Sequence, residues 1–232
     1  MRTFQVCSLV AVCVLARGAL AQSAQASPKA EWNFDKDEAG KLPEEWSVRM
    51  TNPEGRLAKW RVTADPSAPS KPNVMTLVET KESGSTYNLL INDDTSYKDL
   101  DLAVKVKANT GKEDQGGGLL WRCTDQDNYY ICRVNPLEGN YRVYKVVEGK
   151  RKQLESANIE LAAGKWHALR VTMLGDQITC YLDGKKVLKA KDDTFKEAGT
   201  IGLWTKADAA SSFDDLTVSA PSPGEQPKVG DK

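Results

Sequence analysis

The sequence predicts an all-β fold, a two-sheet antiparallel sandwich, and three observations support this prediction. From Glu31 onward, apolar and polar residues alternate with a period of two, which is the pattern of half-buried strands. Turn-forming residues interrupt the alternation about every 8 to 12 positions. Helical periodicity is nearly absent. The 232 residues are 40% hydrophobic and include six Trp and seven Tyr, so the chain can bury a core of its own.

The first element is a predicted secretory signal peptide, residues 1–26. Arg2 gives a positive start, and residues 6–15 form an apolar run that is too short to span a bilayer. Small residues at Ala19-Leu20-Ala21 and Ala24-Gln25-Ala26 place the expected cleavage after residue 21 or 26. We therefore expect a secreted or periplasmic protein without a membrane span.

The charge balance argues against a nucleic-acid partner. The chain has 32 basic and 32 acidic residues, and removal of Arg2 and Arg17 with the signal peptide leaves 30 against 32, a net charge of −2. Proteins that bind nucleic acid by neutralising phosphates normally carry a basic excess.

Two strand units in the remaining sequence are especially clear. In residues 100–107, Leu and Val alternate with Asp, Ala and Lys, which predicts a strand with one buried face. Residues 169–188 predict a hairpin, because Gly175-Asp176 and Asp183-Gly184 supply turn chemistry. The pairs expected about the first turn are Leu174–Gln177, Met173–Ile178, Val171–Cys180 and Leu169–Leu182.

Residues 27–219 contain no repeat and no linker, and they are interpreted as one domain. The last segment, residues 220–232, carries three Pro and two Gly without periodicity and is predicted to be a disordered tail.

Residues 116–147 predict a three-stranded meander with an unusual polar face. Symmetric pairing about its two turns places Trp121 opposite Cys132 and Val143, and Cys123 opposite Tyr130, on a buried face. The other face collects the candidate ligand-binding residues Arg122, Tyr129, Arg133, Arg142 and Tyr144, together with Ile131.

Two interpretations of this Arg/Tyr face stay open. In the first, the arginines form internal salt bridges, for example Arg142 with Glu155 on the next strand, or with an acidic residue among positions 93–101. In the second, the face is a ligand cleft in which guanidinium groups hydrogen-bond sugar hydroxyls or a carboxylate and Tyr rings stack on a sugar.

The three cysteines beyond the signal peptide do not suggest a metal site. No C-x-x-C motif occurs, and Cys180 is expected in the core. Cys123 and Cys132 are expected on the same buried face, either as two free thiols or as a disulfide.

The order of motifs resembles secreted bacterial concanavalin A-like jelly rolls, close to the laminin-G-like and 3-keto-disaccharide hydrolase (DUF1080) branches. The residues that carry this resemblance are Phe34-Asp35, Gly40, Pro43, Trp46, Gly118-Leu119-Leu120-Trp121-Arg122, Asn128-Tyr129-Tyr130, Trp166-His167-Ala168-Leu169-Arg170-Val171, Asp183-Gly184-Lys185, 199–205 and Phe213-Asp214-Asp215-Leu216. The resemblance implies a jelly roll with a concave, carbohydrate-facing sheet.

Three functional hypotheses follow from the face and the resemblance. The first is an exported carbohydrate- or glycan-binding protein without chemistry of its own, and the second is a glycoside hydrolase of the 3-keto-disaccharide type. The third is a laminin-G-like structural or interaction domain whose polar face is closed by salt bridges. No cofactor is expected.

The sequence does not assign a catalytic residue. The Glu-x-Asp-x-x-Glu strand of family 16 glucanases is absent, and the single histidine, His167, is interpreted as structural. The acidic runs 35–38 and 125–128 are interpreted as turns. Asp35, Asp214 and Asp215 are weak candidates for a structural calcium ion, with capping at a strand edge as the alternative.

Overall fold

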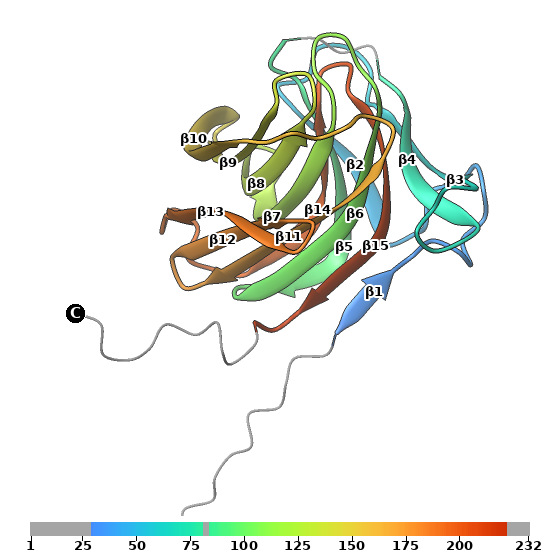
Figure 1. Cartoon of the computed structure of the whole chain (residues 1–232). Helices are drawn as coiled ribbons and strands as arrows, with labels where there is room; N and C mark the ends of the chain where they lie inside the picture. Colours follow the sequence, from blue (N-terminus) through green and yellow to red (C-terminus); the bar gives the residue numbers. More distant parts are fainter. Residues whose placement is uncertain (1–28, 81–83, 222–232) are drawn as a thin grey trace, which may run out of the picture.

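The protein is a two-layer β-sandwich, as the sequence predicts. The computed structural model describes residues 29–80 and 84–221, and their strands form two antiparallel sheets packed face to face (Figure 1). The predicted signal peptide and residues 222–232 of the predicted tail lie outside the described residues. In the part of the chain that is described, no helix is long and apolar enough to cross a membrane.

Sheet A has eight strands and sheet B has seven, and every pairing is antiparallel. The order in sheet A is β13 (Lys185–Lys191), β12 (Gln177–Leu182), β11 (Trp166–Leu174), β6 (Leu100–Thr110), β15 (Ala210–Ser219), β4 (Asn73–Glu79) and β3 (Lys59–Ala64), with β1 (Ala30–Trp32) paired to β15. The order in sheet B is β10 (Lys150–Asn158), β9 (Asn140–Val147), β8 (Asn128–Asn135), β7 (Gly117–Asp125), β14 (Gly199–Lys206), β5 (Tyr87–Tyr97) and β2 (Trp46–Thr51).

The register of the β11–β12 hairpin is the predicted one. Leu174 lies opposite Gln177, and the register continues to Leu169 opposite Leu182. A shift by one residue would turn every apolar side chain of the hairpin toward water, so the alternation specifies the register strongly. Strand β6 follows its predicted pattern too, with Leu100, Leu102, Val104 and Val106 buried.

The main core lies between the two sheets. It is built from the inward-facing side chains of both, including Trp60 and Phe213 from sheet A and Trp121 from sheet B. A second apolar cluster lies on the outer face of sheet B and includes Tyr129, Ile131 and Trp204. Sheet B is therefore buried on both faces, although only one face packs on sheet A.

A β-bulge in β7 changes the predicted register of the meander. The backbone at Arg122 has a φ of 44°, and the regular pairing with β8 is interrupted between Trp121 and Asp125. Trp121 lies opposite Tyr130, so the predicted pairs Trp121–Cys132 and Cys123–Tyr130 were wrong. The predicted pairing of Cys132 with Val143 was right.

The bulge also reverses the face on which Cys123 lies. The extra residue shifts the alternation by one, so Cys123 belongs to the outer cluster while Cys132 belongs to the inner core. The prediction that both lie on the same face was therefore wrong. The described cysteines Cys123, Cys132 and Cys180 are all free and buried, so the alternative of a Cys123–Cys132 disulfide is not realised.

Candidate functional site

The outer face of sheet B is strongly concave. In the strand order, β10 and β5 are five steps apart, which is about 24 Å in a flat sheet. The guanidinium carbon of Arg151 on β10 nevertheless lies 5.1 Å from the ring centre of Tyr87 on β5. It lies 5.9 Å from the ring centre of Trp204 on β14. The sheet must curl toward this face for these side chains to meet.

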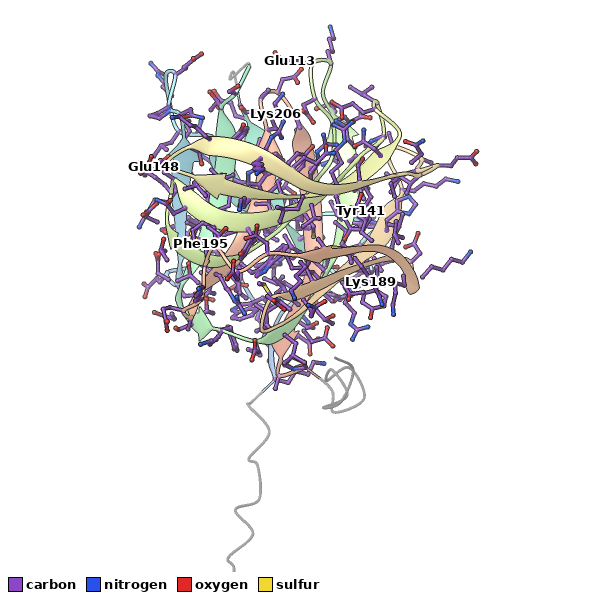
Figure 2. The ribbon with its side chains drawn as sticks, turned by 90° about the vertical axis from the view of Figure 1, so that its left-hand side faces the viewer. Glu113, Tyr141, Glu148, Lys189, Phe195 and Lys206 are labelled. Atoms are coloured by element: carbon purple, nitrogen blue, oxygen red, sulfur yellow. The ribbon has the colours of Figure 1, made fainter. Side chains whose placement is uncertain are left out.

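The two edges of sheet B meet at one end of the concave face. Asn52, which follows edge strand β2, donates a hydrogen bond from Nδ2 to the carbonyl oxygen of Gly149 in the β9–β10 turn, at 2.9 Å. The hydroxyl of Thr51 at the end of β2 hydrogen-bonds that of Tyr129 on β8 at 2.7 Å. Edge strand β10 also lies beside β13 of sheet A. Figure 2 shows the side of the sandwich where these two strands meet, with Glu148 in the β9–β10 turn and Lys189 on β13.

The middle of the concave face is filled by its own side chains. Tyr129, Ile131 and Trp204 are fully buried. Burial raises the pKa of Tyr129 strongly, and its hydroxyl is engaged by Thr51. Tyr129 was a predicted ligand-binding residue, and the structure places it on the predicted face but beneath the surface.

A pocket of about 670 Å³ opens on this concave face at the ends of β2, β5, β7 and β14. Its volume lies within the range of roughly 300–1,000 Å³ that is usual for small-ligand sites. Most of the lining residues are polar, and they include four carboxylates and one arginine. The lining residues are Arg49, Ile91, Asp93, Cys123, Thr124, Asp125, Gln126, Asp127, Asn128, Glu148 and Thr200.

The wall of the pocket formed by residues 125–128 is a rigid turn, as the sequence predicts. Asp125 Oδ1 accepts hydrogen bonds from the backbone N–H of Asp127 at 2.7 Å and from Nδ2 of Asn128 at 2.9 Å. Across the pocket, a guanidinium nitrogen of Arg49 lies 3.8 Å from a carboxylate oxygen of Asp93, and both side chains are about half exposed. The pocket therefore presents fixed acceptors on one wall and solvent-accessible charges on the other.

Arg122 does not lie on the concave face, because the bulge turns it toward the end of the sandwich. The residue is 1% exposed, and its side chain donates to the backbone carbonyls of Lys98, Phe195 and Gly175 at 2.7–2.8 Å. It also lies 3.2 Å from Asp99. The prediction of Arg122 as part of the Arg/Tyr face was wrong, and it links three loops from both sheets. Burial lowers its pKa, and Asp99 opposes that effect.

Arg133, Arg142 and Tyr144 do lie together on the concave face, as predicted. Arg133 and Arg142 pair directly across β8 and β9, and each donates to the Tyr144 hydroxyl at 3.4 Å. Glu138, in the β8–β9 loop, accepts from Arg133 at 2.9 Å and from Arg142 at 3.0 Å. Burial would raise the pKa of Glu138, but hydrogen bonds from Asn140 and Arg133 outweigh it and lower the pKa to about 2.

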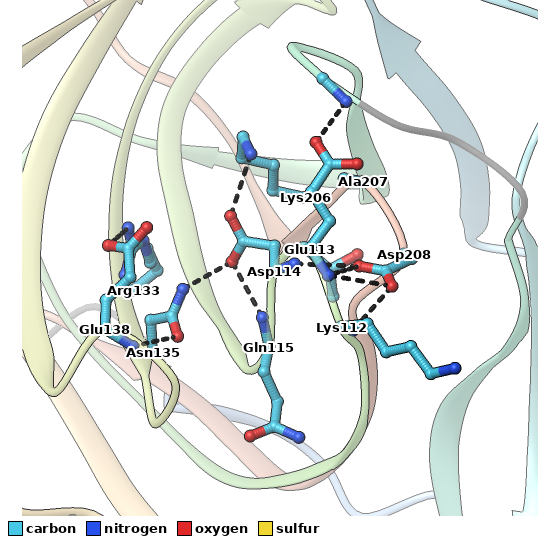
Figure 3. A network of polar contacts seen from close by, with 12 residues as sticks. Lys112, Glu113, Asp114, Gln115, Arg133, Asn135, Glu138, Lys206, Ala207 and Asp208 are labelled. Atoms are coloured by element: carbon cyan, nitrogen blue, oxygen red, sulfur yellow. Dashed lines mark hydrogen bonds and ion pairs between the residues drawn. The ribbon is translucent and has the colours of Figure 1, made fainter.

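A polar network holds this Arg/Tyr cluster in place (Figure 3). Asn135 accepts the backbone N–H of Glu138 at 3.1 Å and donates to Asp114 at 2.8 Å. Asp114 is 3% exposed and forms an ion pair with Lys206 at 3.1 Å. Asp208 in turn accepts backbone N–H groups of residues 112–114. The position of Glu138 is thus fixed from both sheet and loop.

The comparisons with known proteins identify the family of the chain. The sequence pattern of the 3-keto-alpha-glucoside-1,2-lyase-like domain matches residues 38–219. The chain belongs to this family. The predicted resemblance to the 3-keto-disaccharide hydrolases is thereby confirmed. No curated protein matches the sequence.

Solved structures confirm the fold of this family member at low sequence identity. The carbohydrate-binding module CBM66 from Bacillus subtilis is 19% identical, with a TM-score of 0.61 over 76% of this chain and 96% of that one. Domain 4 of AbnA, an extracellular arabinanase from Geobacillus stearothermophilus solved with arabinotriose, is 12% identical, with a TM-score of 0.56 over 86% and 96%. A Bacillus subtilis protein of unknown function with a galectin-like fold is 10% identical, with a TM-score of 0.52 over 74% and 88%.

The calcium candidates of this lyase-like domain are engaged by other partners. Asp214 accepts the backbone N–H and the hydroxyl of Ser70, both at 3.0 Å, and Asp35 accepts the N–H of Asn73 at 3.1 Å. Burial raises the pKa of Asp214 to about 6. Within residues 29–80 and 84–221, no group of three or more His, Cys, Asp or Glu is arranged to hold a metal ion, so the structure does not bring Asp35, Asp214 and Asp215 together as a calcium site.

His167 lies on sheet A, away from the pocket lining. Its Nδ1 is 2.9 Å from a carboxylate oxygen of Asp183, which also accepts the backbone N–H of Ala168. These contacts fit the interpretation of His167 as a structural residue at the start of β11.

Sequence reasoning missed the pocket residues Arg49, Asp93 and Thr200, and it missed Arg151. The first three come from β2, β5 and β14, which are distant in the chain and adjacent only through the strand order of sheet B. Arg151 belongs to an edge strand with weak alternation, so no local pattern assigned its face.

Proposed function

We propose that the protein is an exported carbohydrate-binding protein and that it binds sugar in the pocket on the concave face of sheet B. The observation that carries this proposal is the pocket itself, because it combines a suitable volume with a dense set of hydrogen-bonding groups. Its place on the concave face agrees with what the resemblance to concanavalin A-like jelly rolls implies. The predicted signal peptide supports export.

The chemistry of the lining suits sugar hydroxyls, each of which donates and accepts hydrogen bonds. Asp93 and Asp127 supply acceptors, and Arg49 supplies planar donors. The hydroxyls of Thr124 and Thr200 donate to backbone carbonyls and keep their oxygens as further acceptors. Ile91 gives the pocket an apolar element against which a sugar C–H face can pack. The turn of residues 125–128 is held by internal hydrogen bonds, so binding does not have to order it.

A lyase acting on 3-keto-glucosides is the second candidate, and the family match favours it. In a 3-keto sugar, the proton on C2 is acidified by the neighbouring carbonyl group. A carboxylate in the pocket would act as the general base that removes it, and the substituent on C1 would leave with the electron pair. Asp93 and Glu148 are the carboxylates of the lining that lie outside the turn of residues 125–128.

The test is a panel of neutral oligosaccharides and 3-keto-disaccharides, with binding followed by calorimetry and products by mass spectrometry. Thr124→Trp should block the pocket, since Thr124 is exposed on its wall. Arg49→Ala should weaken binding by about tenfold through the loss of charged donors. Arg61→Ala, on the exposed side of β3 in sheet A, is the matched control and should bind normally.

The outcomes separate the candidates. Binding without turnover that Thr124→Trp abolishes supports the binding protein, and turnover that Asp93→Asn or Glu148→Gln abolishes supports the lyase. If no sugar binds, both candidates fail and the laminin-G-like interaction domain remains.

A further inference from the structure

The Arg/Tyr cluster at the other end of the concave face carries more positive charge than the surrounding residues neutralise. Arg133, Arg142 and Arg151 converge on Tyr144, the first two at its hydroxyl and the third over its ring at 4.5 Å. Glu138 is the one carboxylate that pairs with any of the three among the described residues. The cluster therefore has a local net charge of about +2, and its groups are partly removed from water.

Arg151 is packed on aromatic rings, but its guanidinium group lacks hydrogen-bond acceptors in the described part of the chain. Its guanidinium group lies over the rings of Tyr87, Tyr144 and Trp204, at 4.5–5.9 Å from their centres. Nη1 of Arg151 is buried and has no hydrogen-bond partner. In the described residues, Arg151 forms no ion pair, although its donors need acceptors.

Arg133 adds a second unpartnered donor to the same cluster. The residue is 1% exposed, and its Nε is buried without a hydrogen-bond partner, although Nη1 and Nη2 bind Asn140 and Glu138. Buried donors without acceptors are rare in proteins and unfavourable, and each calls for an explanation such as a catalytic role, a bound ion or an ordered water molecule.

The cluster can be reached from solvent through Arg142 and Glu138. The side chain of Arg142 is 31% exposed and that of Glu138 is 41% exposed. Arg151 is intermediate in exposure, with Nη1 on its buried side. An incoming group that accepts hydrogen bonds would therefore meet Arg142 first and Arg151 and Tyr144 next.

We propose that Arg142 and Arg151, supported by Arg133 and Tyr144, bind the carboxylate of an acidic sugar, a hexuronate unit of an oligosaccharide. Guanidinium groups match the planar, two-oxygen geometry of a carboxylate. The excess positive charge favours an anion, and the aromatic rings beneath Arg151 hold its plane in place. The choice of a sugar as carrier of the carboxylate rests on the proposed function.

The test compares three oligosaccharides of equal length by calorimetry: an oligogalacturonate, the neutral galactose oligomer and a sulfated galactose oligomer. The wild-type protein should prefer the oligogalacturonate over both, and its affinity should fall as salt rises from about 20 to about 300 mM. Arg151→Gln should remove about tenfold or more of that preference and leave the affinity for the neutral oligomer unchanged. Arg142→Gln is the second variant if Arg151→Gln does not fold, and Arg61→Gln is the matched control.

Each outcome is informative. Equal affinity for all three oligomers, or a preference that Arg151→Gln leaves intact, overturns the carboxylate site, and so does a preference for the sulfated oligomer. In those cases, neutral binding that Thr124→Trp abolishes still supports the proposed function. Uronate binding that is lost in Arg151→Gln but kept in Thr124→Trp supports the carboxylate site and counts against the pocket.

Discussion

Arg122→Ala should destabilise the protein severely without removing a ligand contact. The side chain donates to three backbone carbonyls, those of Lys98, Phe195 and Gly175, and to the carboxylate of Asp99. These acceptors belong to the β5–β6, β13–β14 and β11–β12 connections. Arg122 on β7 is therefore a shared hydrogen-bond donor to three connections, two of which are also linked by the hydrogen bond from the Gly175 N–H to Asp99.

The expected loss of stability follows from the acceptors that have no donor in Arg122→Ala. A hydrogen bond to a charged donor contributes about 1.5–3 kcal/mol, and breaking a buried ion pair on one side costs about 3–5 kcal/mol. The Asp99 side chain is 38% exposed, so water replaces part of what Arg122 provides there. We expect a loss of about 4 kcal/mol in the free energy of unfolding, or a fall in Tm of about 8–16 °C for a domain of this size.

Urea unfolding followed by Trp fluorescence measures this loss. The midpoint should fall while the m-value stays unchanged, since the exposed surface of the unfolded chain is nearly the same. Arg61→Ala should change stability by no more than about 0.5 kcal/mol. A loss below about 1 kcal/mol for Arg122→Ala, or lost sugar binding at unchanged stability, would refute the structural role and restore Arg122 as a ligand residue.

Two further predictions concern buried ionisable groups. Burial alone would raise the pKa of Asp192, but hydrogen bonds from Lys145 and other donors outweigh it and lower the pKa from 3.8 to about 2. Asp192→Asn should therefore reduce the free energy of unfolding by about 2 kcal/mol at pH 7. Because the pKa of Asp192 is lower in the folded state than in the unfolded state, this stabilisation is present above about pH 4 and disappears toward pH 2. Urea unfolding across that range should show the stabilities of the wild type and Asp192→Asn becoming equal. Cys123, Cys132 and Cys180 should not react with a thiol reagent until the protein unfolds, because all three are buried and burial raises the pKa of Cys123 to about 12; rapid labelling of the native protein would contradict their placement.

The fold class and the hairpin register could be predicted because they depend on local alternation. The pattern of β6 and the β11–β12 pairing follow directly from residues that are neighbours in the chain. The bulge at Arg122 could not be predicted, since no Gly or Pro marks it and its positive φ belongs to an ordinary residue. Its consequences are nonetheless large: it moves Arg122 off the concave face and Cys123 onto it.

The partner of Arg142 shows a second limit of sequence reasoning. Glu155 was an expected partner, but an irregularity in the β9–β10 pairing between Gln153 and Glu155 brings Glu155 opposite Val143. Ser156 takes the place opposite Arg142 and accepts a hydrogen bond from it at 3.2 Å. Arg142 forms its salt bridge with Glu138 instead. Glu138 lies in the β8–β9 loop, so no strand pattern indicates this pair.

The salt-bridge interpretation of the Arg/Tyr face is confirmed for the buried arginines, and the ligand interpretation stays a prediction for the accessible ones. Arg122 and Arg133 are buried and hydrogen-bonded within the protein, which is the salt-bridge interpretation, and they hold loops and neighbouring side chains in place. Arg142 remains accessible, and Arg151 keeps a buried donor without an acceptor, which is what a ligand interpretation requires. The pocket at the opposite end is lined by four carboxylates and one arginine. A chain with balanced total charge therefore presents opposite charges at the two ends of one concave face, separated by buried aromatic side chains, and the two proposed sites call for different chemical groups.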